Sequence, residues 1–171
     1  MRISLTIITL LAALFLSGCA TRSEPAPADL QARFQSVPSS QATLLQKGAH
    51  KESCDVCGMH LPTFYKTNHA AKTKTHEIKQ YCSLHCVVQD NELNKTDLYD
   101  IKAVDVTTLK FISSQSAYYV VGSHKPGTMS RISKYAFAKR ADADAFAKQY
   151  GGNVMNFYDA YTVSMQDFMQ K

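Results

Sequence analysis

The sequence predicts an α+β fold built from short strands and short helices, and three observations support this prediction. Residues 132–138 alternate apolar and polar side chains, which is the period of a half-buried strand. Residues 140–150 place apolar side chains at helical intervals, and Gly151 and Gly152 follow them as a helix end. Ser83, a residue type that is favoured at helix N-caps, begins a shorter helical pattern over residues 83–92.

The remaining elements follow in chain order. Residues 47–60 have neither a strand nor a helix period and predict a loop, and residues 122–127 predict a turn-rich connection. An amphipathic helix is expected after residue 158. Strands are expected at about 67–73, 76–82, 101–106, 117–121, 132–138 and 154–158. Each half of the folded region therefore has the order strand, strand, helix, without a repeat at the residue level.

The composition limits the classes of function. The chain has 171 residues, of which 45% are hydrophobic and 19% are charged, as expected for one globular domain with a short appendage. The net charge of +5 is spread along the chain without a block of like charges, so nothing indicates nucleic-acid binding. No Ser/His/Asp order, phosphate-binding loop or pair of carboxylates points to hydrolysis or phosphoryl transfer. We therefore expect a protein that is not an enzyme.

The N-terminal region predicts export and attachment to a membrane. Residues 1–18 have a basic start, an apolar stretch and a small-residue end, which together predict a secretory signal. The run Leu-Ser-Gly-Cys19 resembles the bacterial lipobox, in which the cysteine after the cleavage site carries acyl chains. Residues 19–46 predict this lipidated cysteine and a flexible tether, and residues 47–171 predict the folded domain. Ala20 slightly favours the outer over the inner membrane, with the domain facing the periplasm.

Sulfur-containing side chains at close spacing carry the predicted chemistry. Cys19 accounts for one of the five cysteines, and the other four form two pairs in the folded domain. Soft thiolate and thioether ligands favour Cu(I), and a methionine is an unusual ligand for Zn(II). Three other uses of the cysteines stay open: two structural disulfides, a zinc site of four cysteines, or thiol exchange. The two motifs consist of Cys54, Cys57 and Met59, and of Cys82, His85 and Cys86.

The other histidines and methionines fall into two classes according to their neighbours in the sequence: candidate metal ligands, and residues of the surface or the core. His60 and His85 adjoin the cysteines, and His124 and Met129 lie in the predicted loop after residue 121, so each of the four is a candidate metal ligand. The other histidines are expected at the surface, and the later methionines are expected on apolar faces. The residues in these two groups are His50, His69 and His76, and Met155, Met165 and Met169.

Several of these motifs, taken in order, resemble the NosL family of nitrous oxide reductase accessory lipoproteins. The lipobox is followed by the Cys-Asp-Val-Cys-Gly-Met run at 54–59, by Ala-Tyr-Tyr-Val-Val-Gly-Ser at 117–123, and by the aromatic and alanine-rich run at 135–146 that leads to two glycines. The resemblance implies two small ββαβ units similar to those of organomercurial lyase. It also implies a Cu(I) chaperone that delivers metal to the copper-sulfur centre of periplasmic nitrous oxide reductase, together with a membrane-bound maturation complex.

The resemblance also assigns metal ligands by position. Cys57 and Met59 match the family's cysteine-glycine-methionine motif, Cys54 matches the longer form of that motif, and Met129 matches a loop methionine. The family loop commonly reads Gly-Pro-Met-Gly, whereas this chain has Pro-Gly-Thr-Met129-Ser. The second motif can supply a second metal site, complete the first, or form a disulfide; it comprises Cys82, His85 and Cys86. The alternative to a copper chaperone is a periplasmic zinc or heavy-metal module that resembles a treble clef and has a structural or sensing role.

Overall fold

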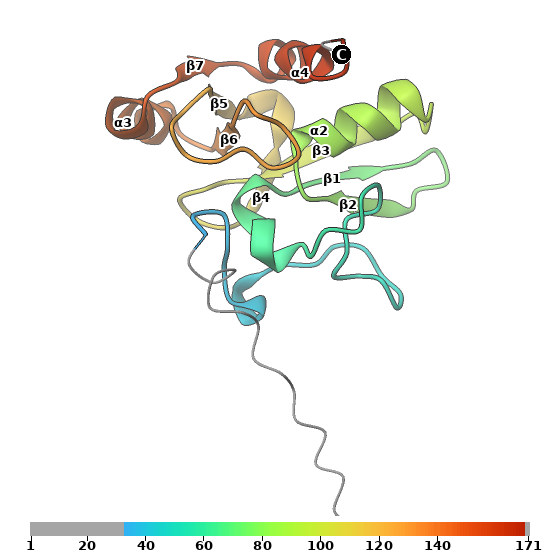
Figure 1. The fold of residues 1–171 in the computed structure, drawn as a ribbon. Coiled ribbons are helices and arrows are strands. Elements are labelled where there is room, and N and C mark those ends of the chain that lie inside the picture. The colour runs from blue at the N-terminus through green and yellow to red at the C-terminus, as the bar shows by residue number, and fades with distance from the viewer. Residues whose placement is uncertain (1–32, 170–171) are drawn as a thin grey trace, which may run out of the picture.

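Two small antiparallel sheets with helices packed on them make up residues 33–169, the part of the chain that this computed structural model describes (Figure 1). The first sheet has four strands in the order β2-β1-β3-β4, and the second has three in the order β6-β5-β7. The first half thus reads β1-β2-α2-β3 and the second reads β5-β6-α3-β7. This confirms the predicted α+β class and the two ββαβ units.

Most observed bounds agree with the predicted ones, but residues 157–158, predicted as the end of the last strand, instead begin α4. The strands are β1 (His69–Lys72), β2 (Ile78–Tyr81), β3 (Tyr99–Val104), β4 (Phe111–Ser113), β5 (Tyr118–Val121), β6 (Lys134–Phe137) and β7 (Asn153–Met155). The α-helices are α2 (Leu84–Val88), α3 (Arg140–Tyr150) and α4 (Phe157–Gln166). The single-turn and irregular helices are η1 (Ser39–Gln41), η2 (Pro62–Thr67), η3 (Gln89–Leu93) and η4 (Ser114–Ser116). The sequence analysis did not predict β4 or η2.

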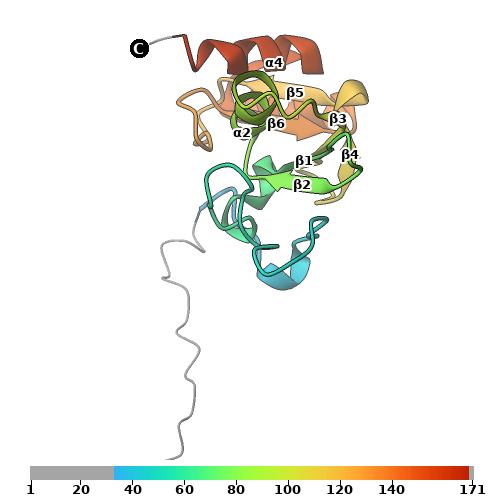
Figure 2. The same cartoon turned by 90° about the vertical axis from the view of Figure 1, so that its right-hand side faces the viewer.

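Helix α4 connects the two halves. It begins at Phe157 after Asn156, whose side chain accepts a hydrogen bond from the Asp159 backbone N–H at 3.0 Å, which is an N-cap. The turned view shows α4 lying across α2 on the side away from the first sheet (Figure 2). The second sheet joins the first through the backbone N–H of Val106, which donates to the carbonyl oxygen of Ala136 at 3.0 Å. The cysteine-bearing helix α2 is therefore covered by an element from the other half.

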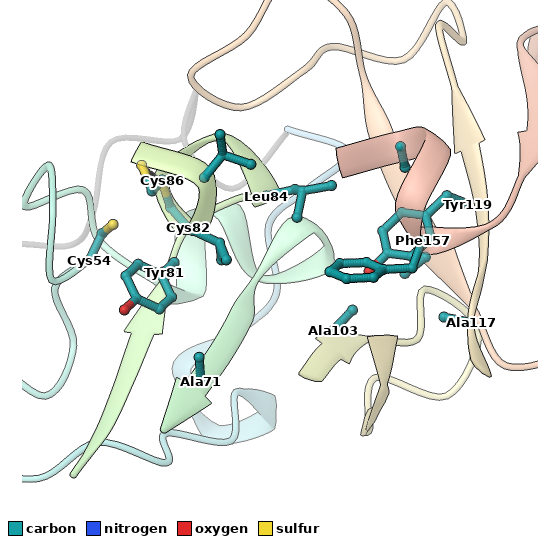
Figure 3. Close-up of a cluster of buried hydrophobic side chains, with 14 of the residues drawn as sticks. Cys54, Ala71, Tyr81, Cys82, Leu84, Cys86, Ala103, Ala117, Tyr119 and Phe157 are labelled. Atoms are coloured by element: carbon teal, nitrogen blue, oxygen red, sulfur yellow. Dashed lines mark hydrogen bonds between the residues drawn. The ribbon is translucent and has the colours of Figure 1, made fainter. Parts of the chain in front are cut away.

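The main core runs through both halves. Apolar side chains from β1, β2, α2, β3, β5 and α4 form one buried cluster, which three of the cysteines join at one end (Figure 3). Tyr119 and Phe157 lie at the other end, with Leu84 between the two ends. The cysteines are thus part of a packed interior, and their positions are set by the core.

The start of the folded domain differs from the prediction. The predicted tether extended to residue 46, but Phe34 packs edge-on against Tyr135 with ring centroids 5.4 Å apart, and Val37 is buried. The Gln35 side-chain amide donates to the carbonyl oxygen of Pro126 at 2.8 Å. Isolated apolar residues without a period gave no sequence signal for this packing. The signal peptide and Cys19 lie outside the described residues.

Between residues 33 and 169, no helix has the length and apolar character needed to cross a membrane.

Gly152 is required by the geometry between α3 and β7. Its φ is +93°, and a Cβ there would lie 2.8 Å from the Val121 carbonyl oxygen. We expect Gly152→Ala to lower the free energy of unfolding by about 2–3 kcal/mol, measured by urea denaturation. Gly48→Ala is the matched control, because its φ is +98° but nothing lies within 4 Å of the added Cβ. Equal losses in both variants would contradict the proposed backbone clash.

Candidate metal centre

The loop that carries the first two cysteines is folded by its own backbone hydrogen bonds. The Cys54 N–H donates to the Met59 carbonyl oxygen at 2.8 Å, and the Gly58 N–H donates to the Cys54 carbonyl oxygen at 2.9 Å. Gly58 has φ of +74°, which a glycine adopts without strain. The Asp55 N–H donates to Gln80 in β2 at 3.0 Å. We call residues 53–60 the knuckle; it is fixed against the strand that leads to the second cysteine pair.

An ion-pair network holds the knuckle from the side. Lys79 Nζ lies 2.7 Å from Asp55 Oδ2 and 3.4 Å from Asp90 Oδ2. Asp90 is buried, and its Oδ2 accepts a hydrogen bond from the Tyr81 hydroxyl at 2.8 Å. Hydrogen bonds from Thr96 and Tyr81 keep the pKa of Asp90 below its usual value although burial opposes this. The Asp90 carboxylate therefore stays charged and fixes Lys79 between the two acidic residues.

The second cysteine pair lies at the start of α2. Cys82 follows β2 directly, and Cys86 lies in the first turn of the helix, so both side chains turn to the same side as the knuckle (Figure 3). Thr67 Oγ1 donates a hydrogen bond to the Cys82 carbonyl oxygen at 2.8 Å and helps to hold the segment in place. The transition from β2 to α2 thus brings two thiols to the end of the core.

The four cysteine sulfurs form one group. All four lie within 4.8 Å of one another, and we call them the four-sulfur group: Cys54, Cys57, Cys82 and Cys86. Cys57 Sγ is 3.5 Å from Cys82 Sγ and 3.7 Å from Cys86 Sγ, and the last two are 3.7 Å apart. None of these cysteines is in a disulfide. The structure therefore brings the cysteines of the two motifs together in one place.

The sulfur spacing fits a single soft metal ion. A tetrahedral centre with metal–sulfur bonds of about 2.3 Å has sulfur–sulfur edges of about 3.8 Å. The separations among Cys57, Cys82 and Cys86 are 3.5–3.7 Å, close to this value, so these three sulfurs are near the spacing that an ion requires. Met59 Sδ adds a fifth sulfur, because it lies 4.0 Å from Cys82 Sγ.

The pKa values of the four thiols are shifted in different directions. Hydrogen bonds from Cys82 lower the pKa of Cys54 and of Cys57, and burial opposes both shifts. The pKa values of Cys82 and Cys86 are raised, first of all because both are hydrogen-bonded to Cys54. Cys54 and Cys57 therefore favour the thiolate form more than Cys82 and Cys86 do, and a metal that binds all four sulfurs would release protons.

Access to the group is one-sided. Cys57 is half-buried, whereas the other three cysteines are buried. A polar cavity of about 400 Å³ borders Cys54 and is also lined by Gln46, His50, Asp55 and Glu77. Cys57 is therefore the thiol that a ligand from another molecule can approach most directly.

None of the three candidate histidines belongs to the four-sulfur group. His85 points to Asp167, with Nδ1 3.2 Å from Oδ2, and its ring stacks on Phe168. His60 is exposed and bonds Thr63, and His124 is exposed in the loop after β5. Met129 lies in the same loop with 41% of its surface exposed and φ of +59°.

Two expectations about single residues are wrong. His69 is buried, and its ring joins the sheets because Nε2 lies 3.1 Å from the Tyr119 hydroxyl and Nδ1 lies 2.9 Å from the Thr67 carbonyl oxygen. Met169, expected on an apolar face, is 71% exposed because α4 ends before it. His50 and His76 are exposed, and Met155 and Met165 pack on the core, as expected.

Sequence reasoning missed the residues that hold the site. Lys79, Thr67 and Asp167 contact the segments that carry the sulfurs, but none lies in a motif with a recognisable spacing. Only the topology brings them to the site, so no local sequence signal could have found them.

Comparisons with known proteins agree on one family. The family profile of NosL matches residues 46–164. The copper-binding lipoprotein NosL of Stutzerimonas stutzeri is 27% identical over 172 aligned residues, covering 95% of this chain and 82% of that protein. The crystal structure of the copper chaperone NosL from Shewanella denitrificans matches with a TM-score of 0.53 and 26% identity, covering 66% of this chain and 93% of that one.

Proposed function

The chain belongs to the NosL family, and on this basis we propose that it is a copper chaperone that binds Cu(I) at the four-sulfur group and releases it to a partner protein. The proposal rests above all on one observation: four cysteine sulfurs lie close together, and the thioether of Met59 lies beside them. Such soft ligands suit Cu(I) and disfavour hard ions such as Mg²⁺ or Ca²⁺. The relatives described as a copper-binding lipoprotein and a copper chaperone support the same reading.

The geometry favours a carrier over an enzyme. Cu(I) accepts low coordination numbers, so a partner's sulfur can bind the ion before the last ligand of this chain leaves. Cys57 is the most accessible of the four thiols and is the natural first point of exchange. The ion itself is the cargo, and nothing in the proposal requires a covalent change in another substrate.

The location and client follow from the family resemblance. We propose that Cys19 is acylated and anchors the chain to a bacterial membrane, with the domain facing the periplasm and the outer membrane slightly favoured. The proposed client is nitrous oxide reductase, whose copper-sulfur centre would be loaded together with a membrane maturation complex. Transfer from the Cu(I)-loaded protein to copper-free reductase, followed by recovery of the centre's absorption spectrum, tests this client.

An anaerobic titration with Cu(I) against a chromophoric chelator tests copper binding directly. We expect the reduced protein to remove Cu(I) from the chelator at a defined stoichiometry. A protein that leaves the Cu(I)–chelator complex intact would refute the copper site.

A zinc or heavy-metal module is the second candidate, because the sulfur spacing also suits a tetrahedral four-cysteine zinc site. The metal content after purification without added metal separates the two. One tightly held Zn²⁺ that Cu(I) cannot displace would favour the module over the chaperone.

Cys57 and Met129 are expected to differ in their contributions to Cu(I) binding. Cys57→Ala removes a charged ligand within the four-sulfur group, and we expect it to weaken Cu(I) affinity by at least about 30-fold. Met129→Ala removes a neutral, exposed thioether and should weaken affinity less, by about fivefold. Competition with the chelator under anaerobic conditions measures both. Equal affinity for the wild type and Cys57→Ala would contradict the assigned site.

A further inference from the structure

Two anchors tie the loop between β5 and β6 to the segment that carries Cys82 and Cys86. The first anchor is Thr67, whose Oγ1 lies 2.9 Å from Thr128 Oγ1 and 2.8 Å from the Cys82 carbonyl oxygen. Thr67 and Thr128 are both buried, so this link is shielded from water. Residue 128 is thereby fixed beside the first residue of the second cysteine motif.

The second anchor is Asp167, just after the end of α4. Its Oδ1 accepts from Ser130 Oγ at 3.0 Å, and its Oδ2 accepts from Lys134 Nζ at 3.0 Å. The same Oδ2 lies 3.2 Å from Nδ1 of His85, the residue before Cys86. Only 4% of the Lys134 side chain and 11% of the Asp167 side chain are exposed, so the pair is held in place by the packing around it.

The ring of His85 is held at the same point. Phe168 stacks on it with ring centroids 4.3 Å apart. Asp167 and Phe168 therefore both hold the cysteine-bearing helix, while Asp167 also holds the loop. The loop lies beside the start of α2 and below α4 in both views of the fold (Figures 1 and 2).

Met129 lies between the two anchors. Its neighbours Thr128 and Ser130 are each hydrogen-bonded toward the cysteine segment, while its own side chain stays 41% exposed at a φ of +59°. We propose that Asp167 is a positioning residue that holds the loop carrying Met129 beside the segment with Cys82 and Cys86, from where the Met129 thioether assists Cu(I) exchange at the four-sulfur group. This inference rests on the proposed function, because it assigns a role in handling the same ion.

A double-mutant cycle on the full chain tests the proposal. Cu(I) affinity and the rate of Cu(I) transfer to a chromophoric chelator are measured anaerobically for the wild type, Met129→Leu, Asp167→Asn and the double variant. We expect Met129→Leu to weaken affinity about fivefold in the wild type but less than about twofold in the Asp167→Asn background. Asp167→Glu, which keeps the charge, should restore most of the Met129 effect.

The controls separate positioning from stability. Asp144→Asn removes an exposed carboxylate from an ion pair with Arg140 on α3, and the full Met129 effect should persist in that background. Ser130→Ala breaks one contact of Asp167 and should reduce the Met129 effect even if Asp167→Asn fails to fold. Thermal melting of each copper-free variant identifies those that are unfolded.

The possible results are distinct. A wild-type protein that does not bind Cu(I) would refute the proposed function itself. A protein that binds Cu(I), but in which Met129→Leu costs nothing, or costs the same with and without Asp167, would leave the proposed function intact. That result would overturn the role of Asp167.

Discussion

Replacing Cys82 by serine is expected to weaken Cu(I) affinity by at least about 100-fold, because this sulfur has the most sulfur neighbours in the site. Its Sγ lies 3.5 Å from Cys57, 3.7 Å from Cys86 and 4.0 Å from Met59 Sδ. A serine hydroxyl fits the same space but is a hard, neutral ligand that suits Cu(I) poorly. Anaerobic competition with a chromophoric Cu(I) chelator measures the loss.

This variant also distinguishes a single site from two separate sites. If copper were held only by the first motif and Met129, Cys82→Ser would leave the affinity unchanged, and the single four-sulfur site would be wrong. Ser83→Ala is the matched control, because it changes the next residue and removes no sulfur. Its Oγ makes only a 3.9 Å contact with Cys82 Sγ, so its copper affinity should equal that of the wild type.

The second large effect concerns stability against acid. Burial lowers the pKa of His69 from 6.5 to about 4, so the folded protein keeps this imidazole neutral while the unfolded chain protonates it. Between pH 6.5 and 4 the unfolded state therefore binds more protons, and the free energy of unfolding falls as the pH is lowered. The contribution of His69 is present in full above pH 6.5 and decreases by up to about 1.4 kcal/mol per pH unit in this window.

Urea denaturation of the copper-free protein at several pH values measures this effect. His69→Gln should lower stability at pH 7 by about 2 kcal/mol, because the buried hydroxyl of Tyr119 loses its partner. It should also flatten the pH dependence between pH 4 and 6.5 relative to the wild type. His50→Gln, at an exposed position, should leave the wild-type slope. An identical slope in His69→Gln would show that this imidazole is not the source.

Local patterns were sufficient to predict most of the fold. The period of residues 140–150 with two following glycines placed α3 within its observed bounds, and the alternation at 132–138 placed β6. The three residues of β4 are too few to show a period, and they are set by pairing with β3. Phe34 and Val37 are isolated apolar residues in a proline-containing stretch, so their burial depends on surfaces formed far along the chain.

The site could be predicted in its chemistry but not in its assembly. The spacing of Cys54 and Cys57 and of Cys82 and Cys86 marked all four thiols, yet nothing local showed that they share one centre. That depends on Asp55 pairing with the backbone of Gln80, which places the knuckle beside the end of β2. The burial of His69 was missed for a similar reason, since its partner Tyr119 belongs to the other sheet.

The knuckle is held in place by contacts within the protein, and these contacts bear on whether the chain can fold before it binds a metal. Its backbone hydrogen bonds and the Lys79 ion pairs to Asp55 and Asp90 hold the knuckle beside the end of β2. In small zinc domains, by contrast, the free energy of metal binding is the free energy of folding, so losing the metal means unfolding. Because the knuckle has these contacts of its own, we expect the two to be separable here: the chain would fold first, receive its cargo later and give it up again without unfolding.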